Sequence, residues 1–184
     1  HGYGNTVKVG ADYGRAGGRY AVARRFGEDV WAAASSANTS DYGDQMSKMV
    51  LFDTITGIAP AELSANSTST KRIEMAGTDS LIRVVIDLIA TCTSPGNGTT
   101  VLTEVYSTSK AVVVHISAGV STIVGTTTYG TAITQTSMAD CDLTFDIDAD
   151  TQDLKVLFTP PTTAGTTTII RVLASAHITE LFGH

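Results

Sequence analysis

The sequence predicts an all-β protein, an antiparallel β-sandwich of jelly-roll-like kind that follows a short segment of repeat-like strands and turns. Charged residues make up only 16% of the 184 residues, and threonine, serine and glycine fill the gap. Threonine is β-branched and favours strands, whereas serine and glycine favour turns. Several short apolar runs are separated by turn residues with no helical stretch between them. This pattern is typical of an antiparallel sandwich.

The first element, Tyr3–Ala34, combines glycine, alanine and arginine with single aromatic residues. The glycines exclude one amphipathic helix, because each would cost about 1 kcal/mol. Short strand-and-turn units laid one on another are expected instead. Units that small cannot bury their own apolar face, so they need neighbours or partner chains, and the segment predicts oligomerisation. Its aromatic residues recur every five to seven positions and are the candidates for the trimer interface: Tyr13, Tyr20, Phe26 and Trp31.

Residues Ser35–Gln45 are polar and without periodicity, so a linker or turn is expected there. The chain then divides into a trimerisation segment, residues 1–45, and a β-sandwich, residues 46–184. Apolar patterning and turn residues predict the strands of the sandwich. In order they are Lys48–Thr54, Lys71–Met75, Leu81–Thr91, Val101–Ser107, Ala111–Ser117, Leu143–Asp148, Lys155–Thr159 and Thr167–Glu180.

Two of these strands carry more specific predictions. Leu143, Phe145 and Ile147 alternate with polar residues, so they point to one side of a strand. The run Leu154–Thr159 follows after a four-residue turn, which predicts a hairpin. The last strand, Thr167–Glu180, is long and mostly apolar. It is expected to cross the middle of a sheet and to contact a neighbouring chain.

Net charge and hydropathy exclude some classes of partner. The formal charge of −6 argues against nucleic acid, which requires a basic face. No apolar run approaches the roughly 18 residues of a membrane span, so no membrane insertion is expected. Cys92 and Cys141 are too few for a disulfide scaffold and too isolated for a zinc site. They are expected to be core thiols, although spacing alone leaves their pairing open.

Six aspartates crowd the predicted hairpin: Asp140, Asp142, Asp146, Asp148, Asp150 and Asp153. A glycosidase needs two carboxyl groups about 5–9 Å apart across a cleft, one of them with a raised pKa. Asp142, Asp146 and Asp148 share a strand face that alternates with core residues, so solvated, ionised carboxylates are favoured over catalysis. The Asp146–Asp150 run could offer oxygens to Ca²⁺, but an EF-hand would need Gly and Glu where Thr151 and Leu157 stand. An acidic turn is the favoured interpretation.

Other catalytic or cofactor-binding patterns are lacking. The four histidines have no metal-ligand spacing: they are His1, His115, His177 and His184. A histidine could meet its copies on a trimer axis and bind a metal, but one hydrogen-bonded to backbone is favoured. There is no G-x-S-x-G elbow and no phosphate-binding loop. The sequence therefore predicts a non-enzymatic protein without cofactor or metal.

The chain resembles the C-terminal parts of bacteriophage tail fibres and related virion structural proteins. The resemblance lies in GRYAVARRFGEDVWAAASS, GDQMSKMVLFDTIT, PAELSANSTSTKRIEM, DLTFDIDADTQDLKVLFTP and IIRVLASAHITEL. The family usually has an Arg-Trp pair where Arg171-Val172 stands. The resemblance implies a homotrimer on the virion that holds shape or touches the host. Its implied partners are other virion proteins and a host-surface glycan or protein.

The basic cluster Arg15–Arg25 resembles the stacked head repeats of trimeric adhesins and fibres. Its arginines are expected to cover aromatic faces and to pair with Glu28 and Asp29 between chains, rather than to form a solvated loop. A capsid decoration protein and a glycan depolymerase remain alternatives. Individual receptor-binding residues are not identifiable. Recognition is expected in exposed loops, for which the candidates are Ser94–Thr100, Gly119–Thr136 and Thr159–Thr166.

Overall fold

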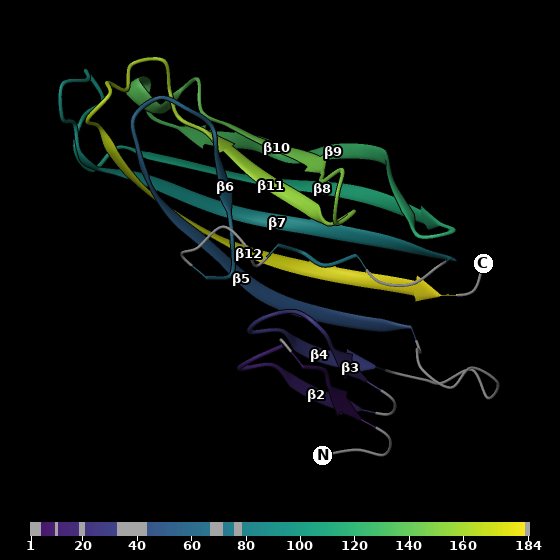
Figure 1. Ribbon diagram of the computed structural model, residues 1–184. Helices are drawn as coiled ribbons and strands as arrows, with labels where there is room; N and C mark the ends of the chain where they lie inside the picture. The colour runs from purple at the N-terminus through teal and green to yellow at the C-terminus, as the bar shows by residue number, and fades with distance from the viewer. Residues whose placement is uncertain are drawn as a thin grey trace.

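The computed structural model describes residues 5–9, 11–18, 21–32, 44–66, 72–75 and 79–182. These residues form strands, turns and one short 3-10 helix, Thr136–Met138. The strands make a seven-stranded, a three-stranded and a two-stranded sheet (Figure 1). The all-β prediction is confirmed.

The seven-stranded sheet, called the large sheet below, has the order β2-β4-β5-β12-β7-β8-β9. Its long strands are β5 (Gln45–Thr56), β7 (Asp79–Ser94), β8 (Val105–Ser117), β9 (Val120–Thr134) and β12 (Ile169–Phe182). In Figure 1 they run side by side as long, curved ribbons. Strand β12 pairs antiparallel with both β5 and β7, so the predicted central position of the last strand is confirmed.

The three-stranded sheet has the order β10-β11-β6, formed by β10 (Asp142–Ile147), β11 (Leu154–Thr159) and β6 (Ala61–Leu63). Strands β10 and β11 are the predicted hairpin, with Leu143 opposite Phe158. The carboxylate of Asp148 holds the turn, because it accepts hydrogen bonds from the backbone amides of Asp150 and Thr151 at 3.1 and 3.0 Å.

One hydrophobic core lies between these two sheets. Leu143, Leu154 and Phe158 of the small sheet pack in the same cluster as buried residues of β5, β7, β8 and β12. The rings of Tyr106 and Phe158 meet edge to face, with centroids 6.0 Å apart. The side of the large sheet that faces this core is called the inner face.

The N-terminal strands form two stacked coils, a name used here for two short consecutive strands joined by a turn. The first coil is made by β1 (Thr6–Val7) and β2 (Arg15–Gly18), and the second by β3 (Val22–Ala23) and β4 (Asp29–Ala32). Strand β1 pairs parallel with β3, and β2 pairs parallel with β4. The interior consists of small side chains, Ala21, Ala23, Val30 and Ala32, which allow the coils to lie close together. The expected stacking of strand-and-turn units is confirmed within one chain.

Strand β4 also pairs antiparallel with β5, so the second coil continues the large sheet. The expected linker falls mostly on residues 33–43, which lie outside the described residues. The division of the chain at residue 45 stays a prediction.

Strand prediction was wrong at three places. The stretches Val101–Ser107 and Ala111–Ser117 were expected as two strands, but Val105–Ser117 is one strand and residues 101–104 form a turn. Its middle, Ser107–Lys110, lacks apolar alternation yet stays extended because it pairs with β7. In Lys71–Met75 only Ile73 makes an isolated bridge, to Leu154, among the residues described there. Strand β6 was not predicted; three residues carry too short a pattern.

The largest correction concerns Gly119–Thr136, expected to be a recognition loop. Most of it is strand β9, which pairs with β8 along nearly its whole length. Ala118 and Gly119 both have positive φ, of 51° and 79°, which suits a tight turn between two twisted strands. Threonine-rich segments favour strands even without apolar alternation, and the pairing with β8 decides the outcome here.

Candidate functional site

The large sheet has a second face, which the small sheet does not cover and which is called the open face below. Side chains alternate along a strand, so every second residue of β5, β7 and β12 points to it. Many of these are large and apolar. Exposed apolar residues of the open face include Trp31, Met46, Val50, Phe52, Ile89, Tyr129, Ile133, Leu173 and Leu181.

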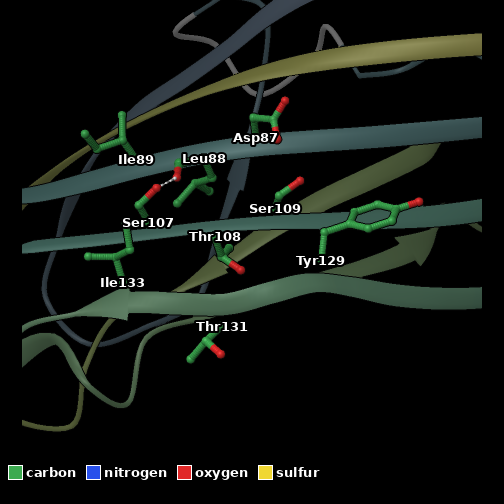
Figure 2. A pocket seen from close by; sticks show the side chains of 9 residues that line it. All are labelled: Asp87, Leu88, Ile89, Ser107, Thr108, Ser109, Tyr129, Thr131 and Ile133. Atoms are coloured by element: carbon green, nitrogen blue, oxygen red, sulfur yellow. Dashed lines mark hydrogen bonds between the residues drawn. The ribbon is translucent and has the colours of Figure 1, made fainter.

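Strand register arranges these residues in rows. Phe52 lies opposite Leu173, and Leu173 lies opposite Ile89. The row continues through Ser107 to Ile133 at the sheet edge, as Figure 2 shows for its last three members. Trp31 lies opposite Met46 in a parallel row, and these side chains are 64% and 62% exposed. Apolar side chains of the open face thus form a row across β5, β12 and β7 and a pair on β4 and β5, and polar residues such as Ser175, Thr179 and Asp87 lie between them.

Charges on the open face are close to balance. Its acids and bases are Asp29, Asp79, Asp87, Arg15, Lys48, Arg83 and Arg171. Three acids thus stand beside four bases, in a chain whose formal charge is −6. The acidic excess therefore lies elsewhere, in part on the hairpin β10–β11. This face is neither a basic nor an acidic patch.

Three shallow hollows lie along the open face, lined mainly by Trp31 and His177, by Phe52 and Arg171, and by Tyr129 and Asp87. Figure 2 shows the third, where Asp87, Ser109 and Tyr129 come from three neighbouring strands. Arg83 lies 5.8 Å from the centroid of the Tyr129 ring and donates a hydrogen bond to its hydroxyl. The polar end of this hollow is therefore already engaged by the protein.

A buried charge cluster joins the coils to the end of β12. Arg25 pairs with both Glu28 and Glu180, and these three side chains are fully buried. Arg24 donates a hydrogen bond to Glu180 at 3.1 Å, and the Gln45 amide donates to the same carboxylate. The backbone amides of Arg24 and Arg25 donate to Glu28 at 2.8 and 3.0 Å. Two acids and two bases thus balance inside the protein.

Electrostatics keep Glu28 and Arg25 ionised. Burial opposes the charge on Glu28, but the Arg25 guanidinium and hydrogen bonds from two backbone amides outweigh it and hold its pKa below the ordinary value. Burial likewise opposes the charge on Arg25, yet the carboxylates of Glu180 and Glu28 raise its pKa. Arg25 pairs with Glu28 within one chain, whereas the sequence-based expectation was pairing between chains. Pairing between chains stays a prediction.

The four aromatic candidates for a trimer interface do not share one environment. Tyr13 is 86% exposed, and its ring meets that of Phe26 edge to face at 5.6 Å. Phe26 itself packs partly against the main core. Trp31 lies on the open face above Gly17, where a methyl group would approach its ring carbons to 2.5 Å. Tyr20 lies outside the described residues.

Two of the hairpin carboxylates, Asp142 and Asp148, are bound in ion pairs. Asp142 accepts from Lys110 at 2.5 Å, and Asp148 pairs with Arg72 and Lys155, each at 2.9 Å. The Lys155 ammonium and the turn amides hold the pKa of Asp148 well below its ordinary value. A glycosidase acid needs the opposite shift. Asp148 therefore serves the turn, and its oxygens already have positive partners in place of Ca²⁺.

The histidine and cysteine candidates show no activated arrangement. His115 and His177 lie on the open face rather than against backbone, and His177 Nε2 is 3.7 Å from Asp87 Oδ2. Cys92 and Cys141 are buried and unpaired, as favoured from the sequence. Burial raises the pKa of both thiols, that of Cys141 to about 12. Both thiols therefore stay protonated.

Two of the three candidate loops lie together at one end of the sandwich. Asn97 exchanges hydrogen bonds with Thr166 and Thr167, and the Thr168 hydroxyl donates to the Pro95 carbonyl at 2.6 Å. A methyl group at Gly98 would lie 2.4 Å from the Gly165 amide nitrogen. This close approach requires glycine, so the two loops form one rigid end.

The residues that the structure describes offer neither a group of side chains for a metal ion nor a helix that could span a membrane. Within them, no three His, Cys, Asp or Glu side chains gather in a way that could hold a metal ion. Nor does that part of the chain contain a helix long and apolar enough to cross a membrane.

Comparison with known proteins does not assign the chain to a family. No protein-family model matches the chain, and no curated protein sequence matches it. One solved structure, the tailspike protein of Acinetobacter baumannii phage AM24, aligns with 71% of this chain and 26% of its own length. The sequence identity is 11% and the TM-score is 0.31. A similarity of this size establishes neither the fold nor the function.

The open face was not predicted as a site, although the sequence carries a signal for it. Strands that face solvent on one side alternate apolar with polar residues, whereas strands covered on both sides are apolar throughout. Strand β5 has Met49 and Leu51 on the inner face and Val50 and Phe52 on the open face. When consecutive residues of a strand are apolar, both faces of the strand are expected to be covered.

Proposed function

We propose that this chain is a non-enzymatic structural and attachment module of a phage tail fibre or similar virion fibre, and that it works as a homotrimer. The open face carries the proposal. Apolar rows across a large sheet are rarely left in water by a monomeric protein, so an assembly that covers them is expected.

The stacked coils support the same function. Parallel coils with an alanine interior form an extendable rod rather than a pocket, and the second coil is hydrogen-bonded to the sandwich through β4 and β5. An appendage that carries mechanical load requires a continuous hydrogen-bonded connection of this kind between the stacked coils and the β-sandwich. The ion pairs of Asp142 and Asp148 favour this function over a glycan depolymerase.

The native mass of the purified chain in solution tests the proposal, measured by light scattering after size exclusion at several concentrations. A stable mass near three times the 19.2 kDa chain is expected. A monomer at every concentration would contradict the assembly. Release of reducing ends from bacterial capsular polysaccharide would contradict the non-enzymatic part.

A further inference from the structure

We propose that the open face is the surface on which copies of this chain pack against one another, so that the apolar rows of one copy are covered by those of the next. The inference rests on the proposed function, since it names the interface of the assembly. It differs from the sequence-based expectation, which assigned the interface to the N-terminal aromatic residues.

The first argument is size. The six strands from β4 to β9 across the large sheet span roughly 24 Å at about 4.8 Å per spacing, and the 14 residues of β12 extend roughly 46 Å. The face therefore measures on the order of 1,000 Å². A stable interface buries about 800 Å² on each partner, so the face is large enough to hold an oligomer together.

The second argument is charge. Two copies of a chain with a charge of −6 repel wherever their acidic surfaces meet. The open face carries three acids among four bases, so it can meet its own copy with opposite charges in reach. Lys48, Arg83 and Arg171 would pair with Asp29, Asp79 and Asp87 of another copy.

Other occupants fit the face less well. Nucleic acid and anionic lipid both require a strong excess of lysine and arginine, which this face lacks. A sugar would need polar groups beside an exposed aromatic ring, but Arg83 already binds the hydroxyl of Tyr129, and the exposed rings of Trp31 and Phe52 lie opposite the apolar Met46 and Leu173. A second copy brings both the apolar rows and the matching charges.

The edge next to the face points the same way. Strand β9 is 15 residues long, is mostly exposed, and contains neither a charged residue nor proline. Edge strands in monomeric proteins are protected by charges, proline or short length, because a free edge pairs with other chains. An uncharged edge beside an apolar face is consistent with burial of both in the assembly.

The test uses two charge-reversal variants of the full chain. An acidic-face variant carries Lys48→Glu, Arg83→Glu and Arg171→Glu, and a basic-face variant carries Asp29→Lys, Asp79→Lys and Asp87→Lys. The basic-face variant alone has only bases on the face, and the acidic-face variant alone has six acids beside Arg15, so each is expected to be monomeric by native mass spectrometry. Mixed together, they are expected to form assemblies that contain both.

A matched control reverses three exposed acids outside the face, by Asp12→Lys, Asp146→Lys and Asp150→Lys. It changes the net charge as the basic-face variant does and should assemble like the wild type. Thermal unfolding by circular dichroism shows that the variants are folded.

A second readout needs no disruptive variant. Trp31 is the single tryptophan of the chain and lies 64% exposed on the open face of one copy. Combining Trp31→Phe with Phe52→Trp moves this reporter to the middle of the face. Iodide should quench the fluorescence of either tryptophan less in the assembled protein than after dilution to monomers.

The outcomes separate the two proposals. An assembled wild type whose face variants stay assembled, or whose reporters stay equally quenched, would overturn the inference and leave the proposed function standing. Face variants that separate but fail to recombine would overturn it as well. A monomeric wild type would remove both, and its binding to phosphatidylglycerol vesicles would assign the face to a lipid surface.

Discussion

The two faces of the large sheet have similar residues and different surroundings. On the inner face, Leu51, Val172 and Ile86 are between 0 and 3% exposed, because they pack in one core with the small sheet. On the open face, Val50 and Leu173 come from the same strands and are 53% and 52% exposed. The difference shows that a single copy covers half of the apolar surface that its central strands present.

Removing a carboxylate from the inner side should have the largest effect. Glu180→Ala leaves Arg24 and Arg25 buried without one of their acidic partners. Breaking a buried ion pair costs about 3–5 kcal/mol, and two arginines place this change near the upper end. Urea unfolding should show the loss. A loss below about 1 kcal/mol would mean that the cluster is not closed to water.

A core truncation on the inner side should have a somewhat smaller effect. Phe158→Ala removes a fully buried ring that packs on Tyr106. Truncations of this kind cost about 3–5 kcal/mol, and the lower part of the range is expected because Tyr106 can move into the space. Denaturant unfolding measures it. Unchanged stability would contradict the packing of the small sheet on the large one.

Acid should weaken the inner side by less than either substitution. The pKa of Glu28 is lower in the folded chain than its ordinary value of 4.5. The stability that Glu28 contributes is therefore complete above pH 4.5 and is lost as the pH falls through the folded pKa. Thermal unfolding between pH 6 and 2 measures this. In Glu28→Gln the dependence should be shallower; an equal slope would assign it to other acids.

The same substitution on the two faces gives the smallest effect and the sharpest comparison. Val172→Thr places a hydroxyl in the core and should cost about 1–3 kcal/mol. Val50→Thr, on the open face, should change the stability of a dilute monomer by less than about 0.5 kcal/mol. Unfolding at low protein concentration measures both. Equal losses would mean that the open face is covered within one chain.

The sequence was sufficient to predict the elements whose structure depends on neighbouring residues in the chain. The alternation of Leu143, Phe145 and Ile147 and the turn after them were enough for the hairpin β10–β11. Strand β9 was missed because its extended form depends on pairing with β8 rather than on its own pattern. The pair of Arg25 with Glu180 could not be predicted, since 155 residues separate them and only the fold brings them together.

The stacked coils give the N-terminal part of the chain a length that is set by the number of coils. Thr6 pairs with Val22, and Arg15 pairs with Asp29, so one coil uses 14 to 16 residues to advance by one strand spacing. A parallel strand spacing is about 4.8 Å. Insertion or removal of whole coils would thus change the length of the stack in steps of about 5 Å while leaving the β-sandwich unaltered. Length and recognition could then be varied independently in such a protein.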